Sequence, residues 1–134
     1  KSGAHLYFDF AHHPTAVSTT IKTVRQMYPE KRLIAAFEPK NATSRRNIFI
    51  DQYAESLNTA DQVLIAPCHE DKRIPAALRM STESIQHKIG EHARAFQRKE
   101  ELKEWLVSSL TNNDVVVFMS CGTFLEIPCS LLND

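Results

Sequence analysis

Three short apolar runs constrain the fold of this chain more than any other feature of its sequence. Residues 33–37, 63–66 and 115–119 are continuously apolar over the length of a strand, and the last run is the richest in β-branched residues. Such a run is typical of a strand that is buried on both faces, as in a parallel sheet covered by helices. We therefore expect residues 115–119 to form a central strand.

Segments with helical periodicity separate these runs. Residues 16–28 place Val17, Ile21, Val24 and Met27 at helical spacing and stop before Pro29, which would end such a helix. Similar patterns recur along the chain. We expect further helices over residues 44–57, 81–89, 99–110 and 124–132, and short strands over residues 6–10 and 92–96.

The same periodicity predicts which side chains face inward. The helix over residues 44–57 would be capped by Thr43 or Ser44. Residues 67–79 hold charges and two prolines without a clear period, which predicts an exposed loop that either carries function or varies. The apolar positions expected on the buried faces of the second and fourth helices are Ile48, Tyr53, Ala54, Leu57, Leu102, Trp105, Leu106 and Leu110.

Strands that alternate with helices predict an α/β fold: a Rossmann-like, doubly wound, mostly parallel sheet with helices on both faces. In such folds ligands bind in the crevice beyond the carboxyl ends of the strands. Three polar segments follow strands here, over residues 9–15, 38–46 and 120–123. They are candidates for one shared site. The glycine pattern G-x-G-x-x-G is absent from the sequence, so we assign no NAD site.

Composition narrows the class of partner. Sixteen basic and sixteen acidic residues cancel and are interspersed, which argues against nucleic acid or an anionic membrane as the main partner. No apolar run reaches the roughly 20 residues of a membrane span, and the cytoplasm is the expected location. Small ligands or proteins are the expected partners.

The length of the chain and the spacing of its cysteines predict a single domain whose cysteines are reduced. The 134 residues suit a single core, and the three cysteines show no C-x-x-C spacing, so we expect thiols rather than disulfides. The spacing of Cys68 and His69 relative to the other thiols is not that of recurring zinc sites, so we assign no metal. The sequence has no phosphate-binding loop of the G-x-x-x-x-G-K-[ST] type, so an ATP-consuming activity would need more chain.

The stretch FDFAHHPT, residues 8–15, is the strongest candidate for a site. It joins an alternating strand to Pro14, which suits the first turn of a helix, and it carries Asp9, His12, His13 and Thr15 at the junction. Free N–H groups and the helix dipole favour an anion there, so a nucleotide or phosphate is the natural ligand. Ordinary turn and capping chemistry is the alternative explanation.

This stretch resembles the D-[FY]-[AG]-H-H-P signature that opens the C-terminal domain of the Mur ligases, the ATP-dependent amide-forming enzymes of peptidoglycan synthesis. RLIAAFEP and KNATSRR, residues 32–39 and 40–46, are similar to the second strand and the basic loop of that family. DVVVFMSCGTF, residues 114–124, resembles its last core strand and turn. Phe8 stands where many members have a second aspartate.

The Glu38-Pro39 pair distinguishes two branches of the family. The branch that adds L-alanine usually shows Q-P-H-R at this point. The E-P-K-N-A-T run of this chain is more similar to the branch that joins L-alanyl-γ-D-glutamyl-meso-diaminopimelate to UDP-N-acetylmuramate in peptidoglycan recycling. Two alternatives stay open: an L-alanine ligase domain, and a module that binds a small anion without chemistry of its own.

The resemblance implies that residues 1–134 are the C-terminal lid of a three-domain ligase that works through an acyl phosphate. The missing N-terminal and central domains would hold most of the ATP and Mg²⁺ contacts. Asp9 would accept from ribose hydroxyls and His12 would donate near phosphate, with His13 beside them. The residues that would serve the peptide substrate are Lys40, Asn41, Thr43, Arg45, Ser120 and Gly122.

Overall fold

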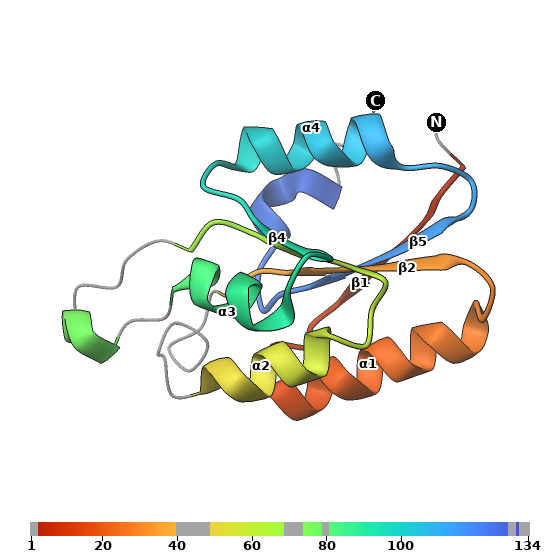
Figure 1. Ribbon diagram of the computed structural model, residues 1–134. Coiled ribbons are helices and arrows are strands. Elements are labelled where there is room, and N and C mark those ends of the chain that lie inside the picture. Colours follow the sequence, from red (N-terminus) through yellow and green to blue (C-terminus); the bar gives the residue numbers. More distant parts are fainter. Residues whose placement is uncertain (1–2, 40–48, 69–73, 79–80, 129–130, 132–134) are drawn as a thin grey trace.

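The apolar runs of the sequence become inner strands of one parallel sheet in the computed structural model of the chain (Figure 1). The structure describes residues 3–39, 49–68, 74–78, 81–128 and 131. Five strands run parallel in the order β1-β5-β2-β3-β4. The expected α/β, doubly wound fold is confirmed. Among the described residues, no helix has the length and apolarity that a membrane span needs.

Each inner strand has a parallel neighbour on both sides. β5 (Asp114–Met119) lies between β1 (His5–Asp9) and β2 (Arg32–Phe37), and every residue of β5 is buried. β3 (Gln62–Ile65) and β4 (Ala93–Ala95) complete the sheet beyond β2. The prediction of an inner strand at residues 115–119 is therefore confirmed, although β2 occupies the middle of the sheet.

Two apolar layers cover the sheet (Figure 1). α1 (Pro14–Met27), α2 (Ile50–Leu57) and α3 (Thr82–Ile89) pack on one face. α4 (Lys99–Ser109) and the chain from the 3₁₀ turn η3 (Phe124–Glu126) pack on the other. Successive strand side chains point to opposite faces, so each inner strand contributes to both layers.

One expected inward position and one strand position are exposed. Met27 is 53% exposed, because the inward stripe of α1 runs through Val17, Ile21 and Val24 to Tyr28, which packs on the core in its place. Phe8 is also half exposed, at 49%, since β1 forms the margin of the sheet and has a neighbour on one side only. The alternation of the first strand thus predicted the strand but not how far it is covered.

Helix ends follow the predicted signals. Pro14 opens α1, and α3 ends at Gly90, as expected. α2 is described from Ile50, so its predicted cap at Thr43 or Ser44 lies outside the described residues. The last predicted helix begins differently, because a 3₁₀ turn with positive φ angles at Phe124–Glu126 precedes the helical residues Ile127 and Pro128.

The predicted loop over residues 67–79 is only partly described. It contains a short 3₁₀ turn, η2 (Ala76–Leu78), whose residues are exposed. Ile74, just before this turn, is buried at 3% exposure. The loop is therefore not exposed along its whole length.

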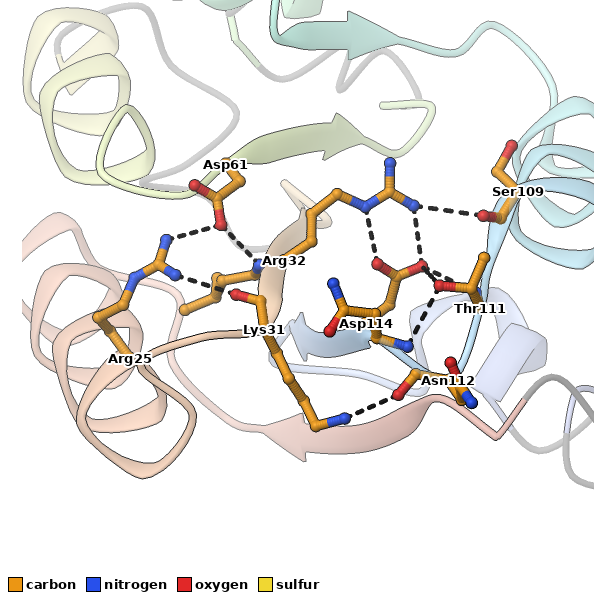
Figure 2. Close-up of polar contacts among 10 residues, drawn as sticks. Arg25, Lys31, Arg32, Asp61, Ser109, Thr111, Asn112 and Asp114 are labelled. Atoms are coloured by element: carbon orange, nitrogen blue, oxygen red, sulfur yellow. Dashed lines mark hydrogen bonds and ion pairs between the residues drawn. The ribbon is translucent and has the colours of Figure 1, made fainter.

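A network of polar contacts joins the amino-terminal ends of the strands, which we call the amino edge of the sheet (Figure 2). The Arg32 guanidinium donates to both carboxylate oxygens of Asp114, at 2.7 and 2.8 Å, and Nη2 also donates to the Ser109 carbonyl at 3.2 Å. The Thr111 N–H donates to Asp114 at 2.8 Å. Burial works to raise the Asp114 pKa, but the bonds from Arg32 and Thr111 outweigh it and hold that pKa below its usual value.

A second part of this network joins α1 to the start of β3. Arg25 donates to Asp61 at 2.9 Å and to the Lys31 carbonyl at 3.2 Å, and Asp61 accepts the Leu33 N–H at 2.8 Å. These contacts hold the starts of the strands together. The network lies at the edge opposite to the strand ends where a ligand site is expected, and we assign it to stability.

Candidate functional site at the carboxyl edge

The carboxyl ends of the strands bring the predicted segments together. The Ser120 N–H donates to the Asp9 carbonyl at 3.1 Å, which links the last turn to the first motif. The Glu38 N–H donates to the Met119 carbonyl at 3.0 Å, which links the second loop to the same turn. Segments that are far apart in sequence therefore meet at one edge, because their strands are neighbours in the order β1-β5-β2.

Asp9 and His12 shape the junction between β1 and α1. Asp9 Oδ1 accepts the Ala11 N–H at 2.8 Å, which is the turn chemistry expected of an aspartate at a strand end. The His12 Nδ1 lies 2.9 Å from the Phe10 carbonyl, so Nδ1 carries the proton. The Nε2 atom can then donate to a phosphate only when the ring is doubly protonated.

His13 has a more peripheral place. It precedes α1 as the N-cap residue, but its side chain makes no capping bond. The ring lies 5.6 Å from the ring of Phe49, measured between centroids. His13 is exposed and remains near His12 in the chain, so its expected role at the nucleotide stays a prediction.

Tyr53 supports His12 from α2, and the sequence analysis did not assign it to the site. Its hydroxyl donates to the His12 carbonyl at 2.5 Å, and its ring is fully buried against Phe37 at 4.9 Å between centroids. Burial raises the pKa of Tyr53 to about 12, so the hydroxyl stays a donor. The sequence does contain a signal for this contact, because Tyr53 lies on an otherwise apolar helix face. A tyrosine hydroxyl that is buried there needs a hydrogen-bond partner within the fold.

A buried carboxylate connects the second loop to the last turn. Glu38 is 3% exposed and Ser120 is fully buried, and the Ser120 hydroxyl donates to Glu38 Oε1 at 2.5 Å. The same hydroxyl accepts the Gly122 N–H at 2.9 Å. The Ser120 side chain thus holds the two segments in register. Its expected contact with substrate remains a prediction, as does that of Gly122.

The basic loop of the sequence prediction cannot be placed. Lys40, Asn41, Thr43 and Arg45 lie outside the described residues. Glu38, which precedes this segment, lies at the carboxyl edge beside the last turn. In the described part of the chain, no group of three or more His, Cys, Asp or Glu side chains is arranged to hold a metal ion.

Fold and site together define an α/β domain in which polar segments meet beyond the carboxyl ends of parallel strands, the place where such folds bind ligands. The family model "Mur ligase, glutamate ligase domain" matches residues 1–122. The chain belongs to the Mur ligase family and is its C-terminal domain.

Solved and curated relatives agree with this assignment. A murein peptide ligase from Psychrobacter arcticus is 27% identical, with a TM-score of 0.75 over 99% of this chain and 28% of that one. A domain of a Haemophilus ducreyi protein, named as a UDP-N-acetylmuramate:L-alanyl-γ-D-glutamyl-meso-diaminopimelate ligase, is 29% identical, with a TM-score of 0.72 over 96% and 88% of the two chains. The UDP-N-acetylmuramate–L-alanine ligase of Agathobacter rectalis is 32% identical over 98% of this chain and 28% of its own length. The chain thus spans less than a third of this curated relative.

Proposed function

We propose that this chain is the C-terminal domain of a three-domain, ATP-dependent ligase that joins L-alanyl-γ-D-glutamyl-meso-diaminopimelate to UDP-N-acetylmuramate. The family membership supports the reaction class. The Haemophilus relative is named after this reaction and the Psychrobacter relative is named as a murein peptide ligase, and both names support the peptide substrate. Residues 1–134 would then be the part that closes over the substrates bound by the other two domains.

The observation that carries the choice of substrate is the buried Glu38. The branch that adds L-alanine usually has glutamine at this position, whereas this chain has a carboxylate that Ser120 holds at 2.5 Å. A carboxyl side chain buried at 3% exposure is costly unless it is hydrogen-bonded, and the Ser120 hydroxyl supplies such a bond, which supports a role for Glu38 in fixing the carboxyl edge at this point. Glu38 precedes, in the chain, the segment that would receive the peptide, residues 40–46.

The residues of this domain would position the reactants. ATP would phosphorylate the carboxylate of UDP-N-acetylmuramate, and the peptide amine would then attack the acyl phosphate. Asp9 retains Oδ2 beyond its bond to Ala11 and would accept from ribose hydroxyls, while a protonated His12 would donate to phosphate. His13 would lie beside them. As the family resemblance implies, most of the Mg²⁺ ligands would lie in the central domain.

The peptide would be held by the loop after Glu38 and by the last turn. Guanidinium and ammonium groups are the usual partners of carboxylates, and the tripeptide carries several. Closure of the domain would exclude water from the acyl phosphate and align the amine with it. The residues that we propose for the peptide are Lys40, Asn41, Thr43, Arg45, Ser120 and Gly122.

Phosphate release by the full-length enzyme tests this function. The assay contains ATP, Mg²⁺ and UDP-N-acetylmuramate, with either the tripeptide or free L-alanine as the amine. We expect release with the tripeptide and little with L-alanine. The opposite preference would contradict the proposal, and release with neither amine would favour a domain that binds a small anion without chemistry.

The L-alanine ligase is the second candidate. It is favoured by the curated relatives, since the Agathobacter enzyme and a Desulfitobacterium hafniense enzyme at 29% identity are both named as L-alanine ligases. The same assay decides between the two amines, because they differ in size and charge. An L-alanine ligase would need only a small site near the reacting carbonyl.

A further inference from the structure

The junction between β1 and α1, residues 10–13, is held from outside by the neighbouring helix α2. The helices α1 and α2 lie side by side on one face of the sheet (Figure 1). The Tyr53 hydroxyl of α2 donates to the His12 carbonyl at 2.5 Å. One turn further along α2, the Ser56 hydroxyl donates to the carbonyl of Pro14, the first residue of α1, at 2.9 Å. We refer to these two hydrogen bonds as the α2 clamp.

The junction needs this support because α1 does not fix its own start through a side chain. His13 is the N-cap residue, and its side chain makes no capping bond. The His13 carbonyl accepts the first bond of the helix, from the Val17 N–H at 2.9 Å, so the His12 carbonyl lies one residue outside the helix. Within the described part of the chain, the donor to the His12 carbonyl is the Tyr53 hydroxyl alone. The helix therefore leaves this carbonyl to α2.

Tyr53 is a rigid support for the junction. Its ring is fully buried and lies 4.9 Å from the ring of Phe37, measured between centroids. Phe37 is the last residue of β2, so the tyrosine ring packs on the carboxyl end of an inner strand. Because closely packed side chains in a core hold one rotamer, the hydroxyl leaves the core at a fixed place. The α2 clamp thus ties the junction to β2 as well as to α2.

The place of the His12 ring depends on the main chain of the junction. Its Nδ1 atom lies 2.9 Å from the Phe10 carbonyl, which belongs to the same junction. This bond fixes the ring relative to the junction but not relative to the sheet. Before the junction, the Asp9 carbonyl is tied to β5 by the Ser120 N–H at 3.1 Å. Across residues 10–16, the described hydrogen bonds that reach the main chain from another element are the two of the α2 clamp.

We propose that Tyr53 and Ser56 are positioning residues of the ligase reaction, which hold the His12 ring where it meets the nucleotide. This inference rests on the proposed function, in which a protonated His12 donates to phosphate, and it adds the residues that keep this donor in place. Tyr53 is fully buried and touches no substrate, so its effect passes through the His12 main chain. A displacement of about 1 Å can cost about 100-fold in rate, so a small shift of the junction is enough to be measured.

The test removes one hydroxyl at a time from the full-length enzyme. Tyr53→Phe keeps the buried ring, and Ser56→Ala removes a single oxygen. Phosphate release is measured with ATP varied at saturating UDP-N-acetylmuramate and amine, and then with the amine varied. We expect kcat/KM for ATP to fall about three- to tenfold in Tyr53→Phe, which corresponds to the loss of one hydrogen bond. The fall should be smaller in Ser56→Ala, because Pro14 is already part of α1. The KM for the amine should stay within about twofold of wild type in both variants.

A double-mutant cycle with His12→Ala separates positioning from a general effect on the fold. If Tyr53 acts through His12, Tyr53→Phe lowers kcat/KM for ATP in the wild-type background and has no further effect once the His12 ring is absent. A merely structural hydroxyl would cost the same factor in both backgrounds. Tyr28→Phe is the matched control, because it removes a hydroxyl that is bonded to Tyr7 at the other end of α1, and it should keep wild-type kinetics. Circular dichroism and thermal unfolding show that each variant is folded at the assay temperature.

The outcomes separate this inference from the proposed function. A loss in Tyr53→Phe that disappears in the His12→Ala background supports the positioning role. Wild-type kinetics in Tyr53→Phe, or equal losses in both backgrounds, would overturn that role and leave the proposed function standing. The cycle is run with whichever amine the wild-type enzyme uses, so a preference for L-alanine would contradict the proposed function while the cycle still tests Tyr53. Phosphate release with neither amine would contradict both proposals.

Discussion

At the scale of single residues, Asp114 has the largest predicted effect on stability. Its side chain is 2% exposed and accepts two bonds from Arg32. Asp114→Asn removes the charge and leaves the guanidinium poorly paired, so we expect the free energy of unfolding to fall by about 2–3 kcal/mol. Urea unfolding of the 134-residue chain measures this. Asp51→Asn is the control, because Asp51 is 79% exposed in its pair with Lys88 and should change stability by less than about 0.5 kcal/mol.

The lowered pKa of Asp114 predicts that the folded chain loses stability as the pH falls. The Asp114 pKa is lowered in the folded chain, so below the ordinary Asp pKa the unfolded chain binds more protons than the folded one. The contribution of Asp114 is complete above the unfolded pKa and is lost as the pH falls through the folded pKa. We expect Asp114→Asn to unfold with a shallower dependence on acid than wild type. Equal slopes in the two proteins would contradict this reading of the network.

The raised pKa of Tyr53 can be tested by the absorbance of tyrosinate. Its pKa is raised to about 12 by burial, and its hydroxyl donates to the His12 carbonyl. In an alkaline titration followed by tyrosinate absorbance, Tyr53→Phe should lose a transition near pH 12 that wild type shows. Removal of the hydroxyl leaves that carbonyl without its donor, so we also expect a loss of about 1–2 kcal/mol in unfolding free energy. A variant that keeps the late transition would show that the transition belongs to another tyrosine.

At the scale of elements, the end of α3 depends on Gly90. Its φ of +109° and ψ of −151° belong to a region that only glycine adopts readily. A Cβ at this position would meet nothing within 4 Å, so the cost of Gly90→Ala is one of backbone conformation alone. We expect a loss of about 1–3 kcal/mol in unfolding free energy, measured by thermal or urea unfolding. Glu91→Ala, at the exposed neighbouring position, should stay within about 0.5 kcal/mol of wild type.

At the scale of the whole molecule, the proposed function depends on domains beyond this chain. We expect His12→Ala in the full-length enzyme to lower kcat by about 100-fold or more, because the proposed donation from His12 to phosphate would be worth that much in a closed site. The 134-residue domain should keep its thermal stability, since the His12 side chain bonds only to the Phe10 carbonyl among the described residues. His87→Ala, at an exposed site in the last turn of α3, is the matched control. Unchanged turnover in His12→Ala would remove His12 from the site.

The sequence by itself determined the class of fold and the place of the first motif. Apolar runs at β2, β3 and β5 predicted strands buried on both faces, and Pro14 and Gly90 marked helix ends. These signals are local, because a run of apolar side chains or a restricted φ angle acts within a few residues of chain. The junction that carries Asp9 and His12 follows from the same local pattern.

The tertiary structure alone decided which segments meet. The inner strands are similarly apolar, so their sequences do not specify the order β1-β5-β2-β3-β4, which depends on how both helical layers pack. That order joins Glu38 to Ser120 and leaves Phe8 exposed at the margin. It also brings the start of α3 beside the ends of β3 and β4. Contacts between residues distant in sequence depend on packing geometry, and no local pattern encodes them.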